Sequence, residues 1–216
     1  MRAVMGVSLL SWAFASMGCN IVGAAVVMLH PPLMQDAEIE LTDGRLAIFV
    51  EYAQPRHENP VFTQTFYDRF AEILRERELE AEVVPLSDVF RMRQANPDFG
   101  QWSVQRIGRK LDADQVLYVR VERLSLRNQP GQPLLEPIAE LRMKLIDPRA
   151  IATPARLWPP KGEPEGRVIH RARQTREAAD TVLLDAETVK LARDTAWLAA
   201  KPFYRWDTEK KDPWEP

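Results

Sequence analysis

Residues 103–126, SVQRIGRKLDADQVLYVRVERLSL, decide the fold, because a helix pattern passes through a short acidic turn into a strand pattern. Val104, Ile107 and Leu111 recur at helical spacing, so we predict a helix over residues 103–111. Asp112-Ala113-Asp114 forms the turn, and residues 115–126 are apolar at their start and alternate later, as a strand does.

The residues before this stretch add two more strand and helix patterns. RLAIFVEYA at residues 45–53 predicts a mostly buried strand. Asn59 followed by Pro60 is a helix start, with Asn as the cap and Pro in the first turn. We expect this helix to run to about Glu80, with one apolar stripe made of Phe62, Phe66, Phe70, Ile73 and Leu74.

A short strand and a second helix fill the gap before residue 103. AEVVP at residues 81–85 predicts the strand, and Ser87-Asp88 can cap a helix that runs through about Gln94. The order is therefore strand, helix, strand, helix, strand, which favours a sheet with helices packed on it.

The second half of the chain has a different pattern. IAELRMKLI at residues 138–146 alternates apolar and charged residues, as in a half-exposed strand of an antiparallel pair. Residues 155–158 and 167–174 predict further strands around a Pro/Gly loop, and a long helix rich in small residues follows over residues 185–204. We predict an α/β (α+β) fold with a mixed sheet of about five or six strands. Its first half is β-α-β-α-β, and its second half is an antiparallel hairpin plus a long helix.

The bulk composition is ordinary for a globular protein. The chain has 216 residues, 29 Lys+Arg against 31 Asp+Glu, and a formal net charge of -2. A nucleic-acid partner would require a basic excess clustered in a stripe, so we expect none.

The amino-terminal segment carries the strongest functional signal. Arg2 is the only charge before Asp36, and Cys19 is the only cysteine of the chain. Such a segment is either a secretory signal peptide or an uncleaved membrane-spanning helix, since it exceeds the ~20 apolar residues that a span needs. Both interpretations place the rest of the chain outside the cytoplasm and attach it to a membrane.

Ser16-Met17-Gly18-Cys19 resembles the lipobox of bacterial lipoproteins. In that family the thiol of the first mature residue takes a diacylglycerol, and fatty acyl chains such as palmitate hold the protein at the membrane. The resemblance implies lipidation of Cys19, although Ser16 stands where the family usually carries Leu. Asn20 replaces the aspartate that retains familiar lipoproteins at the inner membrane, which favours the outer membrane over the inner one.

These observations divide the chain into four parts. We predict a signal peptide over residues 1–18, a lipidated apolar segment and linker over 19–41, an α/β domain of periplasmic type over 42–206, and a flexible tail over 207–216.

The globular part resembles the α/β domains of the TolB amino-terminal region, the CsgG curli lipoprotein and LpoB-type lipoproteins. The resemblance is carried by residues 45–53, the helix beginning VFTQTFYDRF, the segment IGRKLDADQVLYVRVERLSL, and LRMKLIDPRA. Leu111, Ala113, Asp114 and Asp147 stand where that family places a Leu-x-Ala-Asp turn and an Asp at a hairpin. The later LWPP around Trp158 is similar to uncharacterised lipoproteins of the same group. The resemblance implies a non-enzymatic role in assembling, recruiting or activating other envelope proteins.

We find no catalytic or metal-binding constellation and expect no cofactor. His30, His57 and His170 lack the spacing of metal ligands, and Asp112 with Asp114 is better explained as a solvated turn. A hydrolase would need at least three polar groups to meet in one pocket, drawn from Asp88, Asp112, Asp114, Asp147, His57 and His170.

Aromatic residues gather towards the end of the chain and are candidates for a protein interface, where such residues are enriched. The candidates are Trp158, Trp197, Phe203, Tyr204 and Trp206. The alternative is that Trp197 and Phe203 belong to the core and the others cover the sheet.

Two classes of function follow. The favoured one is a membrane-anchored envelope lipoprotein that acts as an assembly, adaptor or recruitment factor through protein contacts. The alternative is a membrane-tethered hydrolase or a small-ligand sensor, and the sensor requires an apolar pocket between helix and sheet.

Overall fold

The computed structural model describes residues 33–127, 134–151, 155–160, 162–173, 176–177 and 181–209. These residues divide into two compact units, one with residues 33–35 and 207–209 and the other within 36–206. In the smaller unit the N–H and the hydroxyl of Thr208 both donate to the carbonyl of Leu33, at 2.9 and 2.7 Å. Thr208 belongs to the segment that the sequence assigned to a flexible tail, and residues 210–216 of that segment lie outside the described part, so the flexibility of the tail stays a prediction.

The larger unit contains a six-stranded mixed sheet. Its strands are β2 (Arg45–Tyr52), β3 (Glu82–Val83), β4 (Gln115–Ser125), β6 (Ile138–Ile146), β7 (Arg156–Trp158) and β8 (Arg167–Ala172). The order is β3-β2-β4-β6, and β7 and β8 both pair with the far edge of β6. The β2 pairs with β3 and β4 are parallel, whereas all pairs made by β6 are antiparallel. The predicted fold class is confirmed.

Two short pairs lie outside this sheet. β5 (Leu134–Leu135) pairs with β9 (Arg176–Glu177), and β1 (Met34–Gln35) pairs with β10 (Trp206–Asp207).

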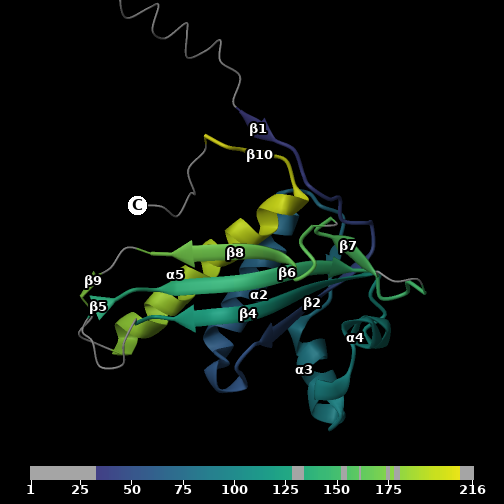
Figure 1. The fold of residues 1–216 in the computed structure, drawn as a ribbon, viewed down its shortest axis with the longest axis horizontal. Helices are drawn as coiled ribbons and strands as arrows, with labels where there is room; N and C mark the ends of the chain where they lie inside the picture. Colours follow the sequence, from purple (N-terminus) through teal and green to yellow (C-terminus); the bar gives the residue numbers. More distant parts are fainter. Residues whose placement is uncertain are drawn as a thin grey trace, which may run out of the picture. The chain divides into compact units, whose positions relative to one another are not determined.

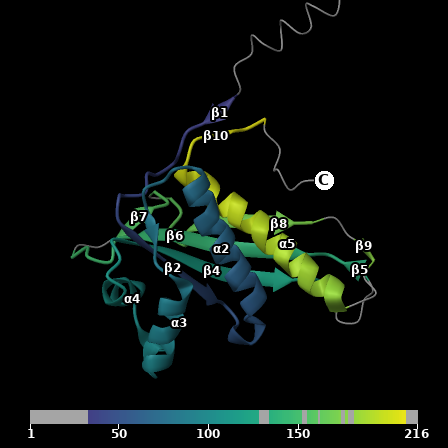
Figure 2. The ribbon, with the colours of Figure 1, turned by 180° about the vertical axis from the view of Figure 1, so that it is seen from behind.

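Two long helices cover one face of the sheet. α2 (Pro60–Glu76) and α5 (Thr181–Ala200) run side by side across it, as Figure 2 shows. The shorter helices α3 (Leu86–Ala95) and α4 (Val104–Lys110) lie beyond the β2 side of the sheet (Figure 1). Three single-turn 3-10 helices connect these elements, namely η1 (Pro55–His57), η2 (Phe99–Gln101) and η3 (Lys201–Phe203).

The core lies between the sheet and this helix pair. The phenylalanines of α2 form a ladder, with ring centroids 6.1 Å apart from Phe62 to Phe66 and 6.0 Å apart from Phe66 to Phe70. Phe203 continues the ladder towards Trp158, at 6.0 Å from Phe70 and 5.6 Å from Trp158. The predicted inward residues of β6 are all fully buried, namely Ala139, Leu141, Met143 and Leu145.

The start of α2 is confirmed, but its predicted end is wrong. Asn59 caps the helix by accepting the N–H of Phe62 at 2.9 Å. The helix ends at Glu76 rather than Glu80, because Glu78 adopts a left-handed conformation with φ of 55° and the N–H of Leu79 donates to the carbonyl of Leu74. This six-to-one hydrogen bond is a Schellman ending, which stops the helix without a glycine.

The other helix boundaries differ in smaller ways. α3 begins at Leu86, with Pro85 at its cap position, so the predicted side-chain cap by Ser87-Asp88 is wrong. The predicted cap of the next helix is present, since Ser103 accepts the N–H of Arg106 at 3.2 Å. α5 begins before the predicted residue 185 and ends at Ala200, where η3 continues the chain.

Candidate functional site

The face of the sheet opposite α2 and α5 is the candidate contact surface. In Figure 1 strands β4, β6 and β8 lie in front of these helices, and among the described residues no helix crosses them. The strand register fixes which residues share this face: Phe49 is paired with Tyr118, Glu51 with Arg120, and Arg120 with Arg142. Beyond β6 the same face continues into Val168 and His170, which pair with Arg142 and Glu140. We call this set the open face.

Charges of both signs are matched across the open face. Glu122 lies 3.6 Å from the Nε of Arg120 and 3.2 Å from that of Arg142, so one carboxylate bridges β4 and β6. The hydroxyl of Tyr118 donates a short hydrogen bond to Glu51. Burial, followed by the charge and hydrogen bond of Glu51, raises the pKa of the Tyr118 hydroxyl, which therefore stays protonated at neutral pH. The surface is mainly polar, with the exposed side chain of Val168 at its β8 side.

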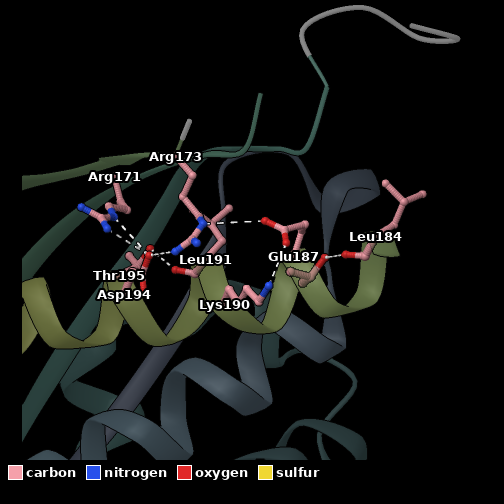
Figure 3. A network of polar contacts seen from close by, with 9 residues as sticks. Arg171, Arg173, Leu184, Glu187, Lys190, Leu191, Asp194 and Thr195 are labelled. Carbon is pink, nitrogen blue, oxygen red and sulfur yellow. Dashed lines mark hydrogen bonds and ion pairs between the residues drawn. The ribbon is translucent and has the colours of Figure 1, made fainter. Parts of the chain in front are cut away.

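A buried ionic network fixes the opposite face of β8 to α5 (Figure 3). Asp194 on α5 accepts from both Nε and Nη2 of Arg171, at 3.2 and 3.1 Å, and is also bound by Arg173. About two turns earlier on α5, Glu187 lies 3.7 Å from the Nε of Arg173 and 3.3 Å from Nζ of Lys190. Both carboxylates are 1% exposed. Buried carboxylates in this number of ion pairs fix the position of the last helix relative to the edge strand.

The sequence analysis did not find this network. Ile169, Arg171 and Arg173 are two residues apart, so they share the face of β8 that α5 covers. On α5, Glu187, Leu191 and Asp194 are spaced by four and three residues and therefore form one stripe. Two patterns in the sequence could have indicated the network. Glu187 and Asp194 interrupt an otherwise apolar stripe of a helix, and Arg171 and Arg173 share a strand face with Ile169.

Three of the predicted interface residues lie in the core. Trp158 is 1% exposed and packs against Phe203, which is itself buried together with Tyr204. The Nε1 of Trp158 donates to Glu38 at 3.0 Å, which satisfies its only polar group. Of these three rings, only Phe203 was placed in the core by the alternative of the sequence analysis, and as placed the three rings offer no surface to a partner.

Trp197 and Trp206 are half-buried and enclose a lysine. The Nζ atom of Lys201 lies 3.6 Å from the ring centroid of Trp197 and 3.8 Å from that of Trp206. The two rings therefore bind a cation of their own chain. Their role as a protein interface stays a prediction.

Three of the six polar groups proposed for a hydrolase do meet, but around arginines. Arg149 lies 3.0 Å from Asp114 and 3.4 Å from Asp112, and its N–H donates to Asp147 at 2.8 Å. Asp114 also accepts the N–H of Arg45 at 2.9 Å. The cluster joins the starts of β2 and β4 to the end of β6.

Asp88, His57 and His170 belong to other elements, namely α3, η1 and β8. Within the described residues, no three His, Cys, Asp or Glu side chains are placed to hold a metal ion. Asp112, Asp114 and Asp147 thus meet arginines where β2 and β4 begin and β6 ends, and these contacts connect the three strands.

The predicted lipidation residue Cys19 lies outside the described residues. None of the helices that the structure describes is long and apolar enough to cross a membrane.

No family model and no curated protein matches the chain. Several solved structures are similar at low identity. The PelC dodecamer from Paraburkholderia phytofirmans is 16% identical, with a TM-score of 0.38, over 82% of this chain and 99% of that one. Lipoprotein GNA1162 from Neisseria meningitidis is also 16% identical, with a TM-score of 0.42, over 70% and 96%. Protein XCC0632 from Xanthomonas campestris, of the DUF330 family, is 15% identical, with a TM-score of 0.29, over 79% and 92%. The resemblance to TolB, CsgG and LpoB-type domains stays a prediction.

Proposed function

We propose that this protein is a lipid-anchored envelope protein that recruits or assembles other proteins through contacts of its α/β domain, and that it is not an enzyme. The observation that carries the proposal is the open face, where a sheet covered by helices on one side leaves ordered polar and apolar side chains of β4, β6 and β8 accessible on the other. Surfaces that bind proteins combine such matched polar groups with a few apolar contacts.

The placement of the acidic residues supports a binding role over hydrolysis. A catalytic carboxylate pair works through raised or separated pKa values and free access to substrate. Asp112 and Asp114 instead each form an ion pair with Arg149, and Asp147 accepts the backbone N–H of Arg149, so all three carboxylates are occupied by contacts within their own chain.

Membrane attachment rests on the amino-terminal sequence. Cys19 follows Gly18 within a charge-free stretch, and acyl chains on its thiol would tether the domain outside the cytoplasm. The absence of an aspartate after Cys19 favours the outer membrane.

Replacement of the proposed lipid acceptor tests the anchor. We expect Cys19→Ala to abolish labelling by a radioactive fatty acid and to release the chain from the membrane fraction, while Ser16→Ala, which keeps the thiol, retains both. Unchanged labelling of Cys19→Ala would contradict lipidation, and retention without labelling would favour the uncleaved membrane helix.

Site-specific photo-crosslinking tests the contact role. A photoreactive residue in place of Val168, which is 44% exposed on the open face, should give crosslinks to envelope proteins in intact cells. The same residue in place of Glu72, on the outer surface of α2, is the control. Equal crosslinking from both positions would argue against the open face as the contact surface.

A further inference from the structure

Strand β2 leaves the second half of its outer edge unpaired. β3 pairs with Arg45 and Leu46 only, through Glu82 and Val83, and the chain then turns away into α3. On its inner side β2 pairs with β4 along seven consecutive residues, Leu46 to Tyr52. The edge of β2 from Ile48 onward is thus a strand edge within the described residues.

The direction of the backbone groups along this edge follows from the hydrogen bonds to β4. The carbonyl of Arg45 accepts from Asp114 at 2.8 Å, and the N–H of Ala53 donates to Val121 at 2.9 Å, so the odd-numbered residues face β4. Since backbone groups alternate along a strand, those of Val50 and Tyr52 face outward. No described residue forms a hydrogen bond with the N–H or C=O of Val50 or Tyr52. Unpaired strand edges of this kind are templates for a further strand.

A cavity of about 290 Å³ lies against this edge. It is lined by four consecutive strand residues, Phe49, Val50, Glu51 and Tyr52. Neighbouring strand residues point to opposite faces of a sheet, so a cavity that touches all four must lie at the strand's edge.

The far wall of the cavity is aromatic and fixed in position. It is formed by Phe99, Trp102 and Val104. Phe99 packs edge-on against Phe49 with ring centroids 5.8 Å apart, and the Nε1 of Trp102 donates to Asp98 at 2.8 Å. The guanidinium of Arg106 stacks on the Trp102 ring, 3.9 Å from the ring centroid. A wall held by these contacts is formed before any ligand binds.

The mouth of the cavity carries a matched pair of charges. Arg93, near the end of α3, lies 3.0 Å from Glu58, and the two side chains are 51% and 39% exposed. An exposed ion pair of this kind adds little stability and opens readily. The charges of Arg93 and Glu58 neutralise each other, and Glu51, which also lines the cavity, accepts the hydroxyl of Tyr118. Because the far wall is apolar, the site favours an apolar segment.

The unpaired edge of β2 and the cavity beside it are together called the groove. We infer that the groove binds an extended, apolar segment of a partner protein. This segment adds as a strand to the outer edge of β2 and places an apolar side chain against Phe99 and Trp102. The inference rests on the proposed role in protein contacts and names where one such contact forms. Outward N–H and C=O groups require an extended backbone, and the aromatic wall selects an apolar side chain. A cavity of about 290 Å³ closed by that wall accommodates a single strand rather than the sheet of a second copy.

Peptide selection provides the probe for a test. Random heptapeptides displayed on phage are selected against the full chain in detergent micelles, and the most enriched sequence is synthesised. We expect this peptide to bind with hydrogen-exchange protection of the Val50 and Tyr52 amides. N-methylation of the peptide at alternate residues should abolish binding, whereas N-methylation at the residues between them should not. A peptide that binds without protection of these amides, or that tolerates N-methylation everywhere, overturns the inference.

Variants of the groove complete the test. Trp102→Ala should weaken peptide binding at least about tenfold. Val50→Pro should do the same, because it removes an outward N–H that β4 does not use. The matched control is Phe90→Ala, an apolar residue 37% exposed on α3 outside the cavity, which should leave binding unchanged. Circular dichroism checks that each variant folds.

The remaining outcomes separate this inference from the proposed function. If Trp102→Ala and Phe90→Ala bind the peptide with equal affinity, the inferred binding site is wrong. It is also wrong if the chain self-associates and the Val50 and Tyr52 amides are already protected, because a second copy then occupies the edge of β2. If crosslinks from Val168 persist in either case, the proposed role in protein contacts is still supported. The inference and the proposed function can therefore fail separately.

Discussion

At the scale of single residues, Asp194 has the largest expected effect on stability. It is 1% exposed and binds Arg171 and Arg173, which are themselves mostly buried. Removal of one partner from a buried ion pair leaves the others charged and uncompensated, which costs about 3–5 kcal/mol. We therefore expect Asp194→Asn to lower the free energy of unfolding by about 3 kcal/mol.

Urea unfolding followed by circular dichroism measures this change. The matched control is Asp185→Asn, because Asp185 lies on the same helix and is exposed. It should change the free energy of unfolding by less than about 0.5 kcal/mol. Equal losses in the two variants would contradict a stabilising role for the buried network.

The same residues show the limit of sequence-based prediction at this scale. The inward residues of β6 were predictable because an alternating pattern is local. Arg171 could not be placed in this way, since a charged residue on a strand is normally exposed. Its burial depends on Asp194, which lies 23 residues further along the chain and meets it only in the folded state.

At the scale of elements, the start of α2 was more predictable than its end. Asn59-Pro60 specifies its own helix start, since the cap acts on residues three positions away. The end of α2 has no such local signal: Glu78 adopts the left-handed conformation that glycine usually supplies. The hydrogen bond between Leu79 and Leu74, which closes this end, became visible only in the structure.

The left-handed conformation of Glu78 predicts a stabilising substitution. We expect Glu78→Gly to raise the free energy of unfolding by roughly 0.5–1 kcal/mol, because glycine has no Cβ to strain at φ of 55°. The control is Glu80→Gly, two residues further, where φ is not positive and glycine only adds flexibility to the unfolded chain. Thermal unfolding of both variants measures the effect, and a loss of stability in Glu78→Gly comparable to that of Glu80→Gly would refute it.

At the scale of the whole molecule, the sequence predicted the mixed sheet and its helices but not which surfaces remain accessible. The open face exists because α2 and α5 both pack on the same side of the sheet (Figure 2). The groove exists because β3 ends after Val83, so that β2 stays unpaired next to Phe99 and Trp102. The open face and the groove both depend on where a strand ends and on which side of the sheet the helices pack. A local residue pattern does not specify either of these. Trp158, Phe203 and Tyr204 lie in the core for a related reason: large rings serve cores and interfaces equally well, so their residue type alone does not separate the two.

Stability of the whole domain should fall in alkaline solution, and Tyr67 contributes to that loss. Its side chain is 4% exposed, and its hydroxyl has no hydrogen-bond partner within the described part of the chain. Burial, followed by the negative charges of Asp68 and Asp88, raises the pKa of the Tyr67 hydroxyl above the ordinary value near 10. The folded state thus holds this proton at pH values where the unfolded state has released it. Stability is fully present below about pH 10 and decreases as the pH rises above it.

Tyr67→Phe removes this ionisation together with an unpaired hydroxyl. At neutral pH we expect the free energy of unfolding to change by less than about 1 kcal/mol, because no hydrogen bond is lost. One pH unit above the ordinary tyrosine pKa, the variant should be more stable than the natural chain by about 1 kcal/mol. Tyr52 and Tyr118, whose pKa values are also raised, are present in both proteins. Their contribution to the alkaline loss of stability is therefore the same in the variant and in the natural chain. Urea unfolding across this alkaline range measures the difference, and parallel losses in the two proteins would show that Tyr67 ionises as readily in the folded state as in the unfolded one.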